Sequence, residues 1–155
     1  MADSVDRSYS FSFSSTQTVR DTGFLDMTRK RDLVISIEFS AFGNTTNASD
    51  TLQLIIQGSN SPEAISSTYI NSDDYWQTYI TKTFTDTALA SDGLATTKLI
   101  YHYDEVDAAD ITNRAKGRKI PPKYVRAKLI CTDTSGSAVF TGVVRFGYNE
   151  AVTSS

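Results

Sequence analysis

Cysteine and histidine are almost absent from this sequence. Its 155 residues include one cysteine, Cys131, and one histidine, His102. A single cysteine cannot form a disulfide within the chain. Its place on the apolar side of an alternating segment favours a small buried side chain over a reactive thiol. A zinc site would also lack ligands, so the composition indicates neither a disulfide framework nor a zinc centre.

Motifs of catalysis are missing as well. No Gly-x-Ser-x-Gly elbow accompanies His102, and neither a glycine-rich phosphate loop nor a dinucleotide fingerprint occurs. Acidic residues cluster between residues 104 and 110, but their spacing differs from that of an EF-hand calcium loop. We interpret this cluster as a solvated acidic loop. We therefore expect a protein that is not an enzyme and that binds no cofactor and no metal.

Long apolar runs and an excess of positive charge are missing too. No run approaches the roughly 20 apolar residues that a membrane-spanning helix needs. The N-terminus, Met1 to Ser4, has neither the basic nor the apolar region of a secretory signal. The formal net charge is −3, which disfavours general attraction to nucleic acid. We expect no membrane and no nucleic-acid partner, and synthesis in a cytosol.

Aromatic and hydroxyl-bearing residues are abundant instead. The chain has eight tyrosines and eight phenylalanines, and it is rich in serine and threonine. β-Branched and aromatic residues suit the pleated, half-buried surface of a sheet. The length is that of one ordinary domain, and no repeat or linker divides it. We expect a single β-sandwich domain over residues 1–155, with a short N-terminal arm of about residues 1–14.

Alternation of apolar and polar residues predicts the strands. It is clearest in segments 124–132 and 140–148, which flank a run of turn-forming residues. Segments 33–42 and 51–58 alternate in the same way around a polar loop. We predict that each of these two pairs of segments forms a β-hairpin.

About eight such strands predict an all-β fold. Consecutive strand-like pieces with long loops near residues 60–76 and 104–119 are typical of an antiparallel β-sandwich, and eight strands suit a jelly roll. An immunoglobulin-like sandwich is the alternative, although its Cys–Trp–Cys signature is missing. Within the first long loop, Ser61 followed by Pro62 predicts one short helical turn.

The first alternating segment has a wholly aromatic apolar side. Tyr9, Phe11 and Phe13 alternate with serines. Such regular alternation indicates a first strand packed on the core. The alternative is an aromatic arm that docks on a neighbouring subunit. In that case removal of residues 1–14 should weaken assembly and leave the melting temperature unchanged.

Aromatic residues also occur where the alternation is lost, between residues 62 and 77. Tyr75 and Trp76 follow a pair of aspartates there. They either pack on the edge of the domain or form a contact patch, because tyrosine and tryptophan are favoured anchors at interfaces. Together with Tyr69 they also raise the alternative of a carbohydrate-binding module, since exposed rings can stack on sugars.

Positive charge is concentrated in two short segments. The first segment is Arg29, Lys30 and Arg31; the second contains Arg114, Lys116, Arg118 and Lys119. Solvated loops with mutual ion pairs are one interpretation, and nucleic-acid binding is another. The hypothesis that we carry forward is that both segments face a negatively charged partner surface, so that binding should weaken as salt rises.

The most regular segments resemble the jelly-roll cement, or decoration, proteins of tailed-phage capsids. The matching strings are LVISIEF at 33–39, TLQLIIQGS at 51–59, PKYVRAKL at 122–129 and VFTGVV at 139–144. The resemblance covers roughly residues 33–60 and 120–148. It implies a non-enzymatic virion protein, made in the host cytoplasm, that binds the outside of an icosahedral head and bridges capsid subunits.

The resemblance also implies partners and contact residues. The partners would be the major capsid protein and further copies of the chain itself, as a homo-oligomer, either a dimer or a trimer. The aromatic and basic residues named above then become candidate capsid or subunit contacts. A tail, neck or fibre component of the virion would have the same composition and is the alternative, together with the carbohydrate-binding module.

Overall fold

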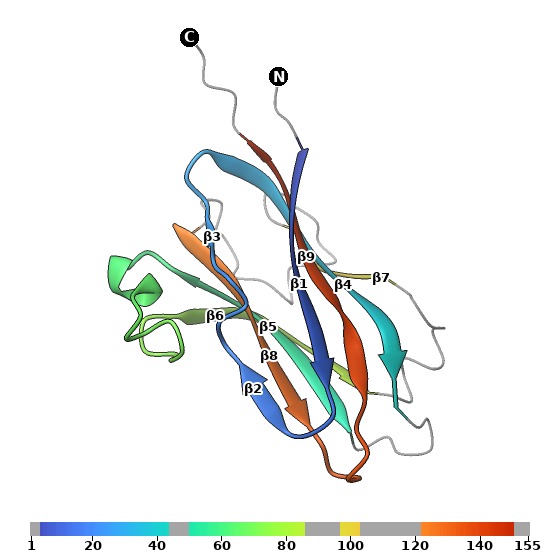
Figure 1. Cartoon of the computed structure of the whole chain (residues 1–155). Helices are drawn as coiled ribbons and strands as arrows, with labels where there is room; N and C mark the ends of the chain where they lie inside the picture. Colours follow the sequence, from blue (N-terminus) through green and yellow to red (C-terminus); the bar gives the residue numbers. More distant parts are fainter. Residues whose placement is uncertain (1–3, 44–49, 86–96, 103–121, 151–155) are drawn as a thin grey trace.

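In the computed structural model, the chain forms two antiparallel sheets that pack face to face (Figure 1). The structure describes residues 4–43, 50–85, 97–102 and 122–150. Sheet A has the strand order β1-β9-β4-β7; sheet B has the order β2-β8-β5-β6, with β3 also paired to β8. The predicted all-β sandwich is confirmed.

The strands fall where the alternation predicts them. Sheet A contains β1 (Ser4–Phe13), β4 (Lys30–Phe42), β7 (Thr97–His102) and β9 (Phe140–Glu150). Sheet B contains β2 (Gln17–Val19), β3 (Leu25–Asp26), β5 (Thr51–Ser59), β6 (Gln77–Thr85) and β8 (Tyr124–Thr132). A short 3-10 helix, η1 (Pro62–Ile65), has Ser61 at its N-cap position and proline in its first turn, which confirms the predicted helical turn.

The strand order is that of a jelly roll. β1 pairs with β9, β4 with β7, β5 with β6, and both β2 and β3 with β8. Because β2 and β3 run along the same partner, they are two segments of one strand, which gives eight strands in the described part of the chain. The β4–β9 and β5–β8 pairings then join these pairs into two sheets. The first strand thus pairs with the last, and the strands between them pair in the same nested way. This pattern is that of the eight-stranded jelly roll and differs from the immunoglobulin-like order.

The two predicted hairpins are wrong. Segments 33–42 and 51–58 belong to β4 in sheet A and β5 in sheet B, and segments 124–132 and 140–148 belong to β8 and β9, again in different sheets. Alternation shows which residues form a strand, but it carries no information about which strand lies beside it. The connecting loops are long enough to cross the roughly 10 Å between packed sheets.

The core lies between the sheets and follows the alternation. Its members on β4 and β8 are Leu33, Ile35, Ile37, Phe39, Val125, Ala127, Leu129 and Cys131. Cys131 is free and completely buried, as predicted for a small apolar side chain. Burial, with Asp133 and Asp50 nearby, raises the pKa of its thiol to about 11. The thiol is therefore neutral at physiological pH.

The aromatic segment at the N-terminus is a strand of the domain's own core. β1 pairs with β9 along its whole length. The Phe11 and Phe13 rings stack with their centroids 5.7 Å apart, and their exposed fractions are 5% and 3%. Tyr9 packs on the same cluster and is partly buried. The structure thus favours the packed strand over the arm, and it leaves the two phenylalanine rings no surface for a neighbouring subunit.

Candidate interaction surface

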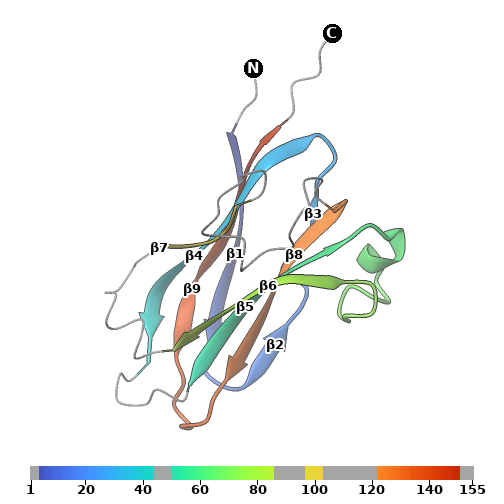
Figure 2. The ribbon, with the colours of Figure 1, turned by 180° about the vertical axis from the view of Figure 1, so that it is seen from behind.

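One end of the sandwich brings together the loops in which contact residues were predicted. The β3–β4 turn, residues 27–30, and the 60–76 loop between β5 and β6 both lie there. The start of β8 joins them: the Met27 amide donates to the Lys123 carbonyl at 2.7 Å, and the Lys123 amide donates to Asn60 Oδ1, also at 2.7 Å. Figure 2 shows the 60–76 loop projecting beyond the sheets beside β8 and β3.

Strand β7 ends and strand β8 begins at this same end. His102, the last residue of β7, pairs with Val34 near the start of β4. Tyr124, the first residue of β8, pairs with Asp26 and with Ser59. The predicted basic contacts Arg114, Lys116, Arg118 and Lys119 belong to the intervening segment and lie outside the described residues.

A buried arginine holds the 60–76 loop against sheet B. Alternation places Arg126 on the polar face of β8, yet its side chain is completely buried because the loop covers that face. Its guanidinium lies 4.2 Å from the centroid of the Trp76 ring. Nε donates to Gln57 Oε1 at 2.9 Å, and the terminal nitrogens donate to the carbonyls of Ile70 and Ser72. One side chain therefore satisfies loop backbone that would otherwise be unpaired.

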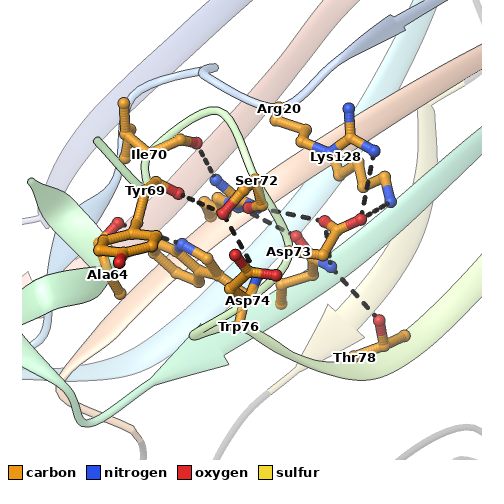
Figure 3. Close-up of polar contacts among 12 residues, drawn as sticks. Arg20, Ala64, Tyr69, Ile70, Ser72, Asp73, Asp74, Trp76, Thr78 and Lys128 are labelled. Carbon is orange, nitrogen blue, oxygen red and sulfur yellow. Dashed lines mark hydrogen bonds and ion pairs between the residues drawn. The ribbon is translucent and has the colours of Figure 1, made fainter. Parts of the chain in front are cut away.

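Asp73 completes this cluster from the loop side (Figure 3). Its carboxylate accepts from Lys128 Nζ at 2.7 Å and from Arg20 Nη2 at 3.2 Å, and it lies 3.4 Å from Arg126 Nη2. Burial opposes the charged form, but these hydrogen bonds, that of Lys128 foremost, outweigh burial and hold the pKa of Asp73 at about 2. Burial lowers the pKa of Arg126 to about 10. Both groups are therefore charged at neutral pH.

The loop buries one of its two predicted contact aromatics and exposes the other. Trp76 is 7% exposed, and its indole nitrogen donates to the Ala64 carbonyl at 3.2 Å. Tyr75 is 40% exposed. The ring of Tyr75 packs edge-on against Tyr69 with centroids 4.6 Å apart. Trp76 therefore supports the loop from within, Tyr75 lies on its surface, and the three rings do not form one platform for a sugar.

The basic β3–β4 turn is the second feature of this end. The Lys30 amide donates to the Met27 carbonyl at 3.0 Å, which closes the turn. Arg29 lies at its tip, exposed, with φ of 60°. The Lys30 ammonium lies 5.4 Å from the centroid of the Tyr148 ring. Arg31 lies in β4, and its side chain is outside the described part of the chain.

Three residues of this end escaped the sequence-based prediction. Arg126, Asp73 and Lys123 were not among the contact residues predicted from the sequence. The available signal was weak: Arg126 stands between the apolar residues Val125 and Ala127, and the only tryptophan of the chain, Trp76, occurs in the 60–76 segment without alternation.

The outer face of sheet A offers a different, hydroxyl-rich surface. A shallow depression of about 610 Å³ lies over β1, β4 and β9, lined chiefly by serines and threonine, with Glu38 and Arg145 at its side. These two residues form an ion pair at 3.5 Å. Within the described ranges, no cluster of histidine, cysteine or carboxylate side chains could hold a metal ion, and no helix is long and apolar enough to cross a membrane.

Two comparisons of the sequence found no match. No family model matches the chain, and no curated protein matches it. The function must therefore be inferred from the fold, from this end of the sandwich and from the resemblance of the strand sequences.

Proposed function

We propose that this chain is a capsid cement, or decoration, protein that binds the outside of an icosahedral phage head and bridges its subunits. The observation that carries the proposal is the position of the resembling segments. They form β4, β5, β8 and β9, the two central strands of each sheet. The resemblance thus concerns the scaffold, and the loops that would contact a particular shell lie largely outside it, as expected when one scaffold serves different shells.

A protein that bridges subunits needs a rigid body with a defined contact surface. The Arg126–Asp73 cluster supplies rigidity, because it fixes the 60–76 loop through both its backbone and its side chains. A loop that is ordered before binding loses little entropy on contact. Tyr75 and Arg29 then lie exposed at the same end of the sandwich. Many copies on one shell would add up weak contacts into firm attachment.

Cosedimentation with mature empty shells tests the proposal. The folded protein should sediment with the shells and saturate at a fixed number of copies per shell. A variant with Arg126 replaced should serve as a control for loop order, and an unrelated β-sandwich of similar charge as a control for trapping. Failure of the folded protein to bind any shell would rule out the cement function. A few copies at one vertex, seen by electron microscopy, would favour the tail or neck alternative.

A further inference from the structure

We infer that the β3–β4 turn and Lys123 together bind an acidic segment of a partner protein, with Arg29 as the principal contact. We call Arg29, Lys30 and Lys123 the basic turn surface. The inference deepens the proposed function by naming the chemistry of the surface that is bound. Only the identification of the partner as a capsid shell rests on the proposed function.

The backbone conformation of Arg29 is the first observation. Arg29 is the only non-glycine with positive φ among the described residues. It is the third of four residues in a turn closed by the hydrogen bond from Lys30 to Met27, a position at which glycine is the usual choice. The left-handed conformation costs a residue with a Cβ about 1–2 kcal/mol. The fold alone would therefore be more stable with glycine at this position.

No contact of the Arg29 side chain within the described part of the domain compensates for the cost of the left-handed backbone conformation. The side chain is exposed and makes no hydrogen bond or ion pair with the rest of the described chain. The turn itself is held by other groups: the Thr28 amide donates to Asp26 Oδ1 at 2.9 Å. Because non-glycine residues in strained backbone cluster at binding sites, we assign the guanidinium a contact outside the domain.

Two ammonium groups accompany Arg29: Lys30 closes the turn, and Lys123 comes from the segment just before β8. Lys123 precedes β8, and its carbonyl accepts from Met27 at 2.7 Å, so the residue lies directly beside the turn. The Lys123 ammonium lies 5.6 Å from the centroid of the Tyr124 ring, and the Lys30 ammonium lies over Tyr148. Such rings attract cations and restrict the lysine side chains. Of the carboxylates here, Asp26 accepts from Thr28. Hydrogen bonds from Thr28, and after them the charges of the nearby Lys123 and Lys30, lower the pKa of the Asp26 carboxyl.

This arrangement fits carboxylates presented by a protein. A guanidinium pairs with a carboxylate through two parallel hydrogen bonds, and flanking ammonium groups act as additional point charges. Nucleic acid would require a larger positive surface, whereas the chain has a formal net charge of −3. We therefore assign the basic turn surface to a stretch of aspartate and glutamate side chains.

Substitution at position 29 separates binding from folding. Arg29→Gly and Arg29→Asn remove the charge and suit positive φ, so their melting temperatures should equal or exceed that of the original protein. Their affinity for shells, and for a short polyglutamate peptide as a probe, should fall about tenfold, the loss of one charge-assisted pair. Arg29→Lys keeps the charge and should retain part of the affinity. Lys82→Gln, on the exposed side of β6, is the matched control and should change neither property.

The possible results distinguish this inference from the proposed function. If Arg29→Gly binds both shells and peptide as the original does, the inference is overturned while the cement function stands. If the peptide binds in an Arg29-dependent manner and no shell binds, the cement function fails while the inference stands. If inorganic phosphate or duplex DNA competes more strongly than polyglutamate at equal ionic strength, the assignment to acidic protein is wrong.

Discussion

The guanidinium of Arg126 lies 4.2 Å from the centroid of the Trp76 ring. This contact joins the centre of sheet B to the 60–76 loop, which covers the sheet there. Both side chains are buried, and each donates to a loop carbonyl as well. The contact explains why a 17-residue stretch without regular alternation, residues 60–76, is nonetheless held in one place.

Arg126→Lys should therefore destabilise the protein although it preserves the charge. Lysine cannot stack its head group on Trp76 in the same way, nor reach the carbonyls of Ile70 and Ser72 together with Gln57. We expect a loss of about 2–4 kcal/mol in the free energy of unfolding, since several buried acceptors become unpaired. Urea denaturation checks this, with Lys82→Gln as the control. An unchanged midpoint would mean that the loop is held by other contacts.

The lowered pKa of Asp73 predicts how the free energy of unfolding depends on pH in the acidic range. Its folded pKa of about 2 is below the ordinary value of 3.8. Its contribution to stability is therefore complete above about pH 4 and is lost as pH falls from there through about 2. Asp73→Asn should flatten this part of the pH profile of unfolding free energy. Asp50, whose pKa is also lowered by hydrogen bonds from Ser135 and Thr134, should keep its own contribution in that variant. Parallel profiles for the two proteins would contradict the assignment.

Gly142 and Gly136 should respond differently to the same substitution. A Cβ at Gly142 would overlap the Glu38 carbonyl and come within 2.9 Å of Phe11 Cζ, so backbone must move. A Cβ at Gly136 would meet nothing within 4 Å, although its φ of 83° disfavours alanine. We expect Gly136→Ala to cost about 1 kcal/mol and Gly142→Ala clearly more, at least about 2 kcal/mol. Equal shifts in thermal unfolding would show that β9 and β4 are not packed as described.

Truncation at the N-terminus should unfold the domain rather than free it from a partner. Phe11 lies 5.9 Å, centroid to centroid, from Phe39 in the middle of the core. Phe11→Ala should cost about 3–5 kcal/mol, and removal of residues 1–14 should lower the melting temperature sharply. Ser10→Ala, on the exposed side of the same strand, is the control. A truncated protein with an unchanged melting temperature would restore the interpretation of this segment as an arm.

The strands could be predicted from the sequence, but their partners could not. Alternation along Leu33–Phe39 or Val125–Cys131 reflects burial on one side of a strand, which any sandwich satisfies. Whether the strand that follows β8 joins the same sheet or the opposite one depends on long-range packing. Alternation does not reflect this packing, and so the hairpins were wrongly predicted. The core role of Cys131 was predictable because it follows from position within one strand.

The contact surface was less predictable, because it depends on segments far apart in the sequence. Arg126 is buried because the 60–76 loop folds back over it. Lys123 belongs to the basic turn surface because its backbone contacts Met27, which lies far earlier in the chain. The unusual φ of Arg29 likewise has no signature in the residue type. The composition of Arg29 to Arg31 indicated a basic segment, and the structure adds which side chains lie beside it.

A cryo-electron-microscopy map of the virus particle, produced with the chain present and absent, tests the central proposal most directly. We predict additional density of jelly-roll shape in many symmetry-related copies on the outside of the head. The end that carries Arg29 and Tyr75 should face the shell at a seam between capsid subunits. Heads that are identical with and without the chain would contradict the proposed function.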